Sequence, residues 1–531
     1  MRPARAHTGQ RWLRILTLGF AAIRFSDLAA ADNSNSTNTT AAAVWPYQSF
    51  RSADFHPPVL KVTRRNGGNA TTSDGYLFIS PTGPGAEDQA PLIISDDGEL
   101  VWQGPAGMGF GFRAQVLEGR PVLSYWDGVA YQDPRGFGYG AVNILDQSYE
   151  RIYRVSLPRN TSSGLFFSGD NVTYDSYVDL HESFITDRGT ILVTATNVTR
   201  ADLRSVGGPK DGWARDAMFY EIEIKTNRVV YRWSALEHAD QIPLNRTLEG
   251  LYGEGRDPAS AFNYFHINSV APVGDDKYLV SSRFLCSIFL ISRKDGSVIW
   301  TLQGKDGGDF ELAPDAGFCY QHDPRIAKMT DTKVILHMHD NANSYHDRTS
   351  TPTTGLLLEL DLEARKARKI QRFVNPNNPV YAVSQGSYQT LPDGHVLLDH
   401  GELPIIEEYD AAGRWIMTAQ FGGNLSSYRG YRQRWVGKPK TAPSLAACSQ
   451  SNGTSLYMSW NGATEVVSWA IYSGTSAKEM KLVTTVPKRG FETSATINTA
   501  SAQYVQVEAR ERGGRPGRKS NLLPVSTLES C

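Results

Sequence analysis

The stretch 265–283 holds a histidine, an amide and a guanidinium within one predicted hairpin. His266 and Asn268 are two residues apart, and residues with this spacing share one face of a strand. A turn at 274–276 then reverses the chain, so that Arg283 returns on the second strand. Imidazole, amide and guanidinium groups can all bind the oxygen atoms of an anion. The hairpin therefore predicts a site for an anionic, oxygen-rich group.

The same kind of hairpin recurs along the chain, with further copies near residues 112, 180, 321 and 384. Alignment of the copies places ten residues at two equivalent positions. The first strands contribute Arg113, His181, His266, His322 and Gln385, and the return strands contribute Trp126, Thr196, Arg283, His339 and His400.

Five of the eleven histidines in the chain fall at these two positions. A single strand histidine is more often a packed core residue, but recurrence at one register favours function for His181, His266 and His322. We predict no metal site, because the fixed charge of Arg283 opposes a divalent cation and no carboxylate recurs at these positions. No C-x-x-C spacing and no G-x-S-x-G motif occurs either.

The chemistry that suits such a ring is transfer of a charged group. A neutral histidine can attack as a nucleophile or remove a proton near neutral pH. Arg283 and Asn268 can stabilise the charge on a sulfuryl or phosphoryl group during transfer. The chain has no G-x-x-x-x-G-K-[ST] loop for nucleotide phosphates. A donor other than a nucleotide, and no cofactor, is expected.

A second hairpin type alternates with the first, with copies near residues 91, 142, 219, 288, 356 and 407. Two alternating hairpins in about six units predict six four-stranded sheets, and hence an all-β, six-bladed β-propeller. The innermost strands of a propeller line its axis, so equivalent residues would form a ring. An array of β-sandwiches is the alternative, but it does not explain why one hairpin type concentrates the polar residues.

The chain divides into four predicted segments. Residues 1–31 have the charged, apolar and small-residue order of a secretory signal peptide. Residues 32–44 are polar and of low complexity, which predicts a disordered lead-in. Residues 45–436 form the propeller, and residues 437–531 have the size and strand pattern of a fibronectin type III-like β-sandwich. An uncleaved anchor or a disordered tail is the alternative for the first segment.

Glycosylation sequons and cysteines also indicate the secretory pathway, with a secreted, lumenal or vacuolar protein as the outcome. An even number of cysteines in an oxidising compartment predicts two disulfides, and we favour Cys286–Cys319 and Cys448–Cys531. Nine N-x-[ST] sequons predict a glycoprotein. They are Asn35, Asn38, Asn69, Asn160, Asn171, Asn197, Asn245, Asn424 and Asn452.

Charge and hydropathy exclude two classes of partner. The formal net charge is −1 and the sequence pI is near 6.8, so a nucleic-acid partner is not expected. No later segment approaches twenty apolar residues, which predicts no stable membrane insertion after removal of the signal peptide. A small molecule is the expected partner.

Four short motifs together resemble the arylsulfotransferases, in particular their eukaryotic, mostly fungal branch. The resemblance covers nearly the whole mature chain. The motifs are Leu180-His181-Glu182, His266-Ile267-Asn268-Ser269, Ser281-Ser282-Arg283 and Gln321-His322-Asp323.

The resemblance implies a reaction as well as a fold. Bacterial members are six-bladed propellers that move a sulfuryl group from a phenolic sulfate ester to another phenol through a sulfated histidine, without a nucleotide donor. Carried over by motif, His322 would be that nucleophile. His181, His266, Asn268 and Arg283 would bind the sulfuryl oxygens or handle the phenolic proton.

Two other functions stay open at the level of sequence. Some fungal propellers of this kind act as cyclases, including hetero-Diels–Alderases of tropolone–sesquiterpenoid assembly. Such an enzyme would shape its substrate against aromatic residues such as Tyr125 or Trp126. A propeller that binds a ligand without turnover is the second alternative, because a fold does not fix a function. Five further ring residues are assigned to substrate binding: Arg113, Trp126, Gln385, His339 and His400.

Overall fold

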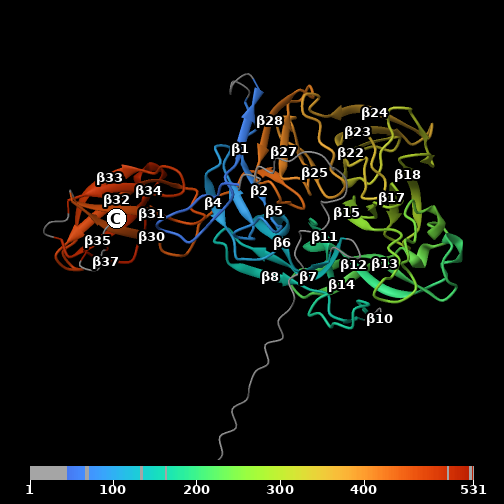
Figure 1. Cartoon of the computed structure of the whole chain (residues 1–531), viewed down its shortest axis with the longest axis horizontal. Helices are drawn as coiled ribbons and strands as arrows, with labels where there is room; N and C mark the ends of the chain where they lie inside the picture. Colours follow the sequence, from blue (N-terminus) through green and yellow to red (C-terminus); the bar gives the residue numbers. More distant parts are fainter. Residues whose placement is uncertain are drawn as a thin grey trace, which may run out of the picture. The chain divides into compact units, whose positions relative to one another are not determined.

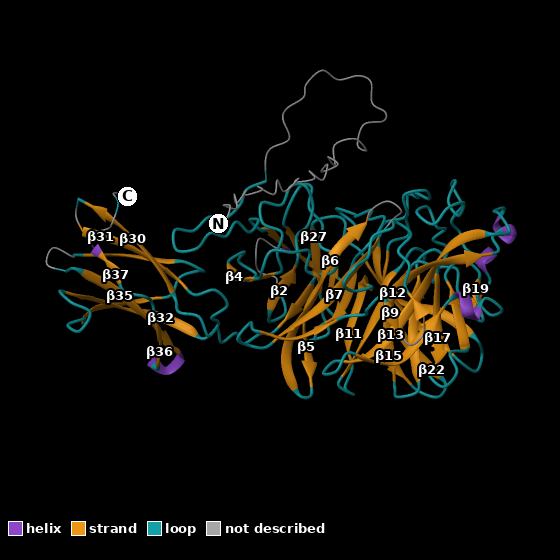
Figure 2. Cartoon of the chain, turned by 90° about the horizontal axis from the view of Figure 1, so that it is seen from below, coloured by secondary structure: helices purple, strands orange, loops and turns teal. Residues whose placement is uncertain are grey.

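The computed structural model describes residues 45–65, 71–131, 136–161, 164–451, 453–498, 502–525 and 529. They belong to one compact unit, Val44–Cys531. The fold is all-β, as the sequence predicts (Figure 2). The expected signal peptide and lead-in, residues 1–44, lie outside the described residues. The helices of the described part are short 3-10 turns at Arg204–Val206, Leu236–His238, Leu244–Arg246 and Arg512–Gly514.

Most strands between residues 76 and 433 pair in antiparallel groups of four. The first group is β29 (Tyr431–Gln433), β2 (Tyr76–Ile79), β3 (Leu92–Ile94) and β4 (Leu100–Gln103). The second is β5 (Phe110–Leu117), β6 (Arg120–Tyr131), β7 (Phe137–Leu145) and β8 (Arg151–Val155). The third is β11 (Val178–Ile185), β12 (Thr190–Ala201), β13 (Gly212–Glu223) and β14 (Arg228–Ser234).

Three further groups follow in chain order. The fourth is β15 (Ile267–Val273), β16 (Lys277–Ser282), β17 (Ser287–Ser292) and β18 (Val298–Gln303). The fifth is β21 (His322–Met329), β22 (Lys333–Asp340), β23 (Thr354–Asp361) and β24 (Lys366–Phe373). The sixth is β25 (Ser387–Thr390), β26 (Val396–Asp399), β27 (Ile405–Tyr409) and β28 (Trp415–Gln420). Short strands β9 (Asn160–Thr161), β10 (Gly164–Leu165), β19 (Gly307–Gly308) and β20 (Glu311–Leu312) lie in the connections.

The first strands of the six groups close a ring. β5 contacts β11, β11 contacts β15, β15 contacts β21, β21 contacts β25, β25 contacts β29, and β29 contacts β5. Two pairings between sequence-distant strands fasten this ring. β29 pairs with β2 and so supplies the first strand of the first group. β1 (Lys61–Arg64) pairs with β28 of the sixth group (Figure 1). The arrangement is β-propeller-like, and the closed ring brings sequence-distant first strands together.

Side chains on both faces of the middle strands are buried, because neighbouring groups pack face to face. One cluster joins Leu192 and Phe219 of the third group to Tyr278 and Val280 of the fourth. Each such side chain contributes roughly 1.5–3 kcal/mol when it leaves water. The sheets therefore form a rigid support for the polar residues at the centre.

Three glutamines bind the backbone of the neighbouring first strand. Gln433 of β29 accepts from the N–H of Ala114 at 2.7 Å and donates to its carbonyl oxygen at 2.8 Å. Gln389 of β25 makes the same pair with Arg432 at 2.7 and 2.9 Å. Gln115 of β5 donates to Ser183 and accepts from Ile185, both at 2.9 Å. These amides satisfy backbone groups that no strand partner reaches.

Replacement of Gln433 by leucine is expected to lower the free energy of unfolding by about 1–3 kcal/mol. The substitution leaves the half-buried N–H and carbonyl group of Ala114 without these partners, and each such loss is costly. Urea denaturation measures the effect. Gln147→Leu is a suitable control, since Gln147 donates one hydrogen bond at an exposed position. Equal stability of the two variants would contradict the role of Gln433.

The C-terminal strands form two further sheets around one hydrophobic core. Trp469, Ile471, Val505 and Val507 are fully buried in it. This is a β-sandwich, and its fibronectin type III assignment and its boundary at residue 437 stay predictions. One sheet holds β30 (Ser444–Gln450), β31 (Gly453–Ser459) and β34 (Thr493–Ile497), and the other holds β33 (Lys481–Pro487), β32 (Val466–Gly474), β35 (Tyr504–Glu511), β36 (Pro516–Lys519) and β37 (Leu523–Pro524).

Cys286 and Cys319 form a disulfide, which confirms the first predicted pairing. Cys531 lies outside the described residues, so the second pairing stays a prediction. Among the described sequons, Asn160, Asn171, Asn245 and Asn424 are exposed, while Asn197 is half-buried. The sequons Asn35, Asn38, Asn69 and Asn452 lie outside the described residues. In the described part of the chain, no helix is long and apolar enough to cross a membrane.

Candidate active site

Three of the predicted histidines meet around one tyrosine. His181 lies in β11, His266 immediately precedes β15, and His322 begins β21. The ring centroids of His181 and His266 are 5.0 Å apart. The Tyr428 ring lies 5.6 Å from His181 and 6.4 Å from His322. All four side chains are buried, so the polar groups meet in the interior of the fold.

The first strands are irregular at the end that carries these residues. Register shifts interrupt the pairing of β5, β11, β15 and β21 with their second strands there. His266, Asp323 and Gln385 have φ angles of 53°, 53° and 64°. This left-handed backbone costs a residue other than glycine roughly 1–3 kcal/mol. Bulges re-aim side chains, and here they turn polar groups of neighbouring strands toward one another.

The hydrogen bonds of His322 define its tautomer. The backbone N–H of Gln385 donates to Nε2 at 3.2 Å, so Nε2 carries a lone pair. The proton is therefore on Nδ1, which lies 2.8 Å from Oδ1 of Asn341 and 3.1 Å from the carbonyl oxygen of Tyr320. Asn341 in turn donates to the carbonyl oxygen of Gln385 at 3.0 Å. A neutral imidazole whose Nε2 carries the lone pair is the form that a nucleophile needs.

His181 is paired with a carboxylate. Its Nδ1 lies 2.5 Å from Oδ2 of Asp179, which also accepts from Thr194 at 3.0 Å. The other oxygen of Asp179 accepts from the N–H of Gly138 at 2.9 Å. Burial alone would raise the pKa of Asp179, but the His181 charge and these hydrogen bonds lower it below its ordinary value. Such a pair orients an imidazole and stabilises its protonated form, as general acid–base catalysis requires.

Further polar groups of the site come from His266, Asn268 and Arg283. The amide nitrogen of Asn263 lies 3.0 Å from Nδ1 of His266, so the opposite nitrogen, Nε2, carries the proton and can donate. Arg283 donates to the carbonyl oxygen of Val383 at 2.8 Å, and its Nε has no hydrogen-bond partner. Asn268 donates to the carbonyl oxygen of Gln321 at 2.7 Å, which leaves its own Oδ1 unpaired. The guanidinium of Arg283 is thus a buried cation whose Nε–H remains available to an anion.

Burial keeps His266 and His322 neutral. It lowers the pKa of His266 well below the ordinary value, and the nearby His181 and Arg283 add to the shift. Burial and Arg283 likewise lower the pKa of His322, against a smaller opposing effect of its hydrogen bond to Asn341. An uncharged His322 beside a permanently charged Arg283 fits attack on an anionic substrate.

Acidification is expected to destabilise the protein below about pH 6.5. Burial lowers the pKa of His337 to about 4, with Asp323 opposing the shift and Arg325 adding to it. The unfolded chain takes up a proton on this residue near pH 6.5 and the folded chain does not, so stability falls as the pH drops through this window. Between about pH 7.5 and pH 5, His337 alone contributes a loss of roughly 2 kcal/mol. Urea denaturation of the wild type and of His337→Phe at both pH values measures this loss in the free energy of unfolding. An identical pH dependence of the two proteins would show that His337 does not cause it.

His339 and His400 form a separate pair. Nε2 of His339 lies 3.3 Å from Nδ1 of His400, whose Nε2 lies 3.2 Å from Glu407. Tyr409 donates to the same oxygen of Glu407 at 2.5 Å. Both histidines are buried, and burial lowers the pKa of His339 well below its ordinary value. His339 also lies opposite His322 and interacts with Asn341, so it links the His322 site to the pair of His400 and Glu407.

Arg113 and Trp126 do not join the histidines. Arg113 lies opposite Ser124, while Trp126 lies opposite Phe110. In the fifth group, His322 lies opposite His339. Phe110 has the equivalent position in the second group, because a bulge between Phe110 and Arg113 offsets the alignment. The indole of Trp126 is buried in a hydrophobic cluster and donates to the carbonyl oxygen of Val178 at 2.9 Å. Gln385 reaches the site through its backbone N–H, and the side chain of Thr196 interacts with Tyr139.

A cluster of buried ion pairs lies beside the histidines. Glu182 contacts Arg325 at 2.6 Å, Arg429 at 3.0 Å and Arg113 at 3.2 Å. Asp323 contacts Arg325 at 2.8 Å and Arg429 at 3.4 Å. Burial would raise the pKa of Glu182, but the three guanidiniums hold it well below its usual range. This ion-pair cluster joins five groups from three different first strands and the segment before β29.

Several of these residues escaped the sequence argument. Asp179, Asn341, Tyr428 and Arg429 recur at no register, so alignment of the hairpins cannot find them. Asp179 lies two residues before His181 on the same strand, and this spacing is the one signal that was available. His337, which stacks on Tyr388 at 4.3 Å, was not among the candidates although it shares a strand face with His339.

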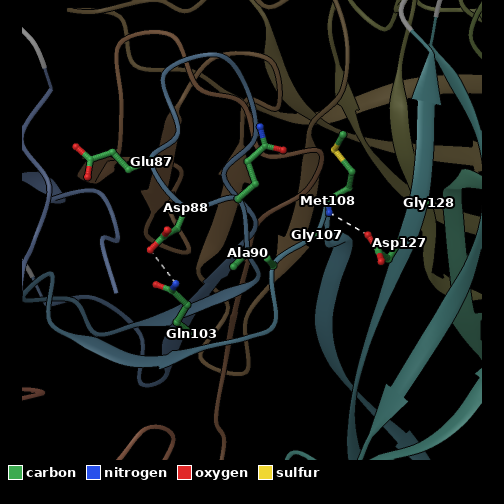
Figure 3. Close-up of a pocket in the computed structure, with 10 residues that line it drawn as sticks. Glu87, Asp88, Ala90, Gln103, Gly107, Met108, Asp127 and Gly128 are labelled. Carbon is green, nitrogen blue, oxygen red and sulfur yellow. Dashed lines mark hydrogen bonds between the residues drawn. The ribbon is translucent and has the colours of Figure 1, made fainter. Parts of the chain in front are cut away.

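A small cavity of about 370 Å³ lies away from the histidines (Figure 3). Its wall includes Asp88 and Asp127, which accept hydrogen bonds from Gln103 at 3.0 Å and from the N–H of Met108 at 3.1 Å. These carboxylates are used within the fold. Across the described residues, no group of three or more histidine, cysteine or acidic side chains is arranged to hold a metal ion.

Comparison with known families identifies the chain. The family model for arylsulfotransferases (ASST) matches residues 113–422, more than half of the sequence. The chain belongs to the arylsulfotransferase family. All of the residues assigned to the three motif-bearing hairpins, from His181 to His322, fall within the matched range.

Other comparisons add little to this assignment. No curated protein matches the chain significantly. A protein of unknown function from Bacteroides caccae is 13% identical over 67% of this chain and 98% of its own, with a TM-score of 0.35. The Penicillium chrysogenum α-L-arabinanase in complex with arabinobiose is 10% identical over 85% and 99%, with a TM-score of 0.32. The β-propeller domain of Myceliophteria thermophila Cps50 (Swd1) is 8% identical over 62% and 85%, with a TM-score of 0.21.

Proposed function

We propose that this member of the arylsulfotransferase family transfers a sulfuryl group between small phenolic molecules, through His322 at the centre of a six-bladed propeller. The hydrogen bonding of His322 is the observation that carries the proposal. Its Nε2 lone pair is held only by the N–H of Gln385, within a site that contains the buried cation Arg283. A neutral nucleophile beside a guanidinium whose Nε–H has no partner matches an anionic sulfate ester.

The first step forms a sulfated enzyme. Nε2 of His322 leaves the N–H of Gln385 and attacks the sulfur atom of the aryl sulfate, and the bond between sulfur and the phenolic oxygen breaks. The leaving phenolate takes a proton from protonated His181, which Asp179 stabilises. Arg283 and Nε2–H of His266 donate to the sulfuryl oxygens as their charge develops.

The second step reverses these roles. The hydroxyl oxygen of a second phenol attacks the sulfur atom while His181 accepts its proton. The bond between sulfur and Nε2 of His322 breaks, and the imidazole returns to its neutral form. Atoms and charges balance over the two steps without a cofactor or a nucleotide.

The test is incubation with a chromogenic aryl sulfate, with and without a phenol acceptor. We expect release of the chromogenic phenol, appearance of the sulfated acceptor, and an SO₃ adduct on the peptide that contains His322 when the acceptor is omitted. Absence of both the transfer and the adduct would refute the proposal. Turnover of a polyene or quinone-methide substrate without any adduct would favour the cyclase alternative, which the core position of Trp126 does not support.

Replacement of Asp179 by asparagine is expected to lower kcat by about 10²–10⁴-fold with a smaller change in KM. The variant keeps the size of the side chain but removes the charge that stabilises protonated His181, as for other histidine–carboxylate pairs. A series of aryl sulfates with increasingly acidic phenols tests whether weaker proton transfer to the leaving phenol causes the loss in kcat. The defect should shrink as the leaving phenol becomes more acidic, because less proton transfer is then needed; a constant defect would argue against this role.

We further propose that the chain passes through the secretory pathway as a glycoprotein. The disulfide between Cys286 and Cys319 supports an oxidising compartment. The four exposed sequon asparagines are accessible for modification. A glycosidase-induced mass decrease of the protein recovered from its native source is the expected result, and an unchanged mass would contradict it.

A further inference from the structure

A second, larger cavity lies at the opposite end of the first strands. Its volume is about 1,070 Å³. The histidines lie where β15 and β21 begin, whereas this cavity reaches the turns at 118–119, 187 and 274–275, where first strands end. Residues from β5, β11, β15, β21, β25 and β29 all line it. It is therefore the far mouth of the same ring of strands.

The buried ion-pair cluster forms the floor of this cavity. Arg113, Arg325 and Asp323 line it, and Glu182 and Arg429 lie behind them. The cluster contains three guanidiniums, which stay charged at all ordinary pH values, and two carboxylates. Within the described residues, these arginines make no ion pair with any other acidic side chain. The floor thus has a surplus of one positive charge.

A surplus charge in a buried cluster is costly unless an anion approaches it. Arg429 is closed off, with 1% of its side chain exposed. The side chains of Arg325 and Arg113 keep 15% and 9% of their surface and face the cavity. In addition, Nε of Arg113 and Nδ1 of His337 have no hydrogen-bond partner. Both side chains are more than nine-tenths buried and line the cavity.

The walls above this floor are aromatic. Phe184 lies 5.4 Å from the guanidinium of Arg113 and 5.7 Å from that of Arg325. The stacked rings of His337 and Tyr388 come from the fifth and sixth groups. Flat faces above a positive floor suit a planar ring that carries an anionic substituent.

The acidic residues at the rim do not cancel this field. Glu118 contacts Lys225 at 2.6 Å, and Asp275 contacts Arg188 at 3.5 Å. Asp187 is also near Arg188, at 3.9 Å. These carboxylates are strongly exposed, so water and salt screen them, whereas the floor is screened much less.

We propose that the far cavity is a second ligand site, which binds a small aromatic carboxylate. The carboxylate lies against Arg325 and Arg113, and the ring lies between Phe184 and the pair formed by Tyr388 and His337. The site is separate from the histidines and does not depend on sulfuryl transfer.

Calorimetric titration of the full chain with benzoate, benzamide and inorganic sulfate tests the assignment. We expect benzoate to bind at least about tenfold more tightly than benzamide, which has the same ring without the charge. Sulfate supplies the charge without the ring and is expected to bind more weakly than benzoate. Equal binding of benzoate and benzamide, or of benzoate and sulfate, would overturn the proposal.

Two variants decide where the ligand binds. Ala327→Trp and Thr390→Trp each place a large ring at an exposed position in the cavity lining, so both should weaken benzoate binding at least about tenfold. If Ala327→Trp does not fold, as judged by circular dichroism and melting temperature, Thr390→Trp provides the same test. His322→Ala should bind benzoate like the wild type. Loss of binding in His322→Ala with retention in the tryptophan variants would assign the ligand to the histidine site and refute a second site.

Discussion

Replacement of His322 by alanine is expected to abolish sulfuryl transfer, with a loss in kcat of at least about 10⁴-fold. The reason is chemical, since no other imidazole of the site can take over the covalent step. Nε2 of His266 carries the proton, and His181 is held by Asp179 for proton transfer. The rate of release of a chromogenic phenol and the SO₃ adduct on the enzyme both measure the effect.

The control for this prediction is His346→Ala. His346 is exposed and stacks on Tyr252 at 4.2 Å, outside the contacts around Tyr428. Its replacement should leave kcat within about twofold of the wild type. A His322→Ala protein that retains transfer and still forms an adduct would move the nucleophile to another residue. Mapping of that adduct by peptide mass spectrometry would then identify it.

Replacement of Glu182 by glutamine is expected to destabilise the fold by about 3–5 kcal/mol. Glu182 is fully buried and contacts Arg113, Arg325 and Arg429. Removal of its charge leaves three buried guanidiniums with Asp323 as the remaining acidic partner. The midpoint of urea denaturation measures the loss, and a failure to accumulate folded protein is the extreme form of the same result.

Glu223→Gln is the matched control, because it makes the same chemical change at an exposed ion pair. Glu223 contacts Arg228 at 3.3 Å near the turn between β13 and β14. Exposed pairs contribute about 0–1 kcal/mol, so this variant should stay close to the wild type. A loss below about 1 kcal/mol for Glu182→Gln would show that the ion-pair cluster does not support the fold, and it would also weaken the charge argument for the far cavity.

The sequence predicted the local parts of the candidate site well. Alternation of apolar residues and turn signals identified the hairpins, and a spacing of two residues put His266 and Asn268 on one strand face. Recurrence of the hairpins brought His181, His266 and His322 into one set, and the structure places these three around Tyr428. These inferences succeed because hairpin geometry depends on near neighbours in the chain.

Alignment failed where a bulge changed the register. Arg113 was placed with the histidines, but the bulge after Phe110 moves it toward Glu182. One extra residue in a strand shifts every side chain beyond it, and sequence alone gives no signal for such a shift. The same limit applies to Trp126, whose aromatic ring was expected at the substrate and is buried in the core.

What the sequence by itself determined is the all-β class, the hairpin order and the family to which the motifs point; it favoured the disulfide between Cys286 and Cys319, which the structure then confirmed. The tertiary structure alone decided which groups meet across strands. Examples are the hydrogen bond from Gln385 to His322, the ion pair between Arg429 and Glu182, and the far cavity that six first strands line. The physical reason is that these contacts join residues far apart in the chain, and their positions depend on ring closure and on bulges rather than on local residue preference.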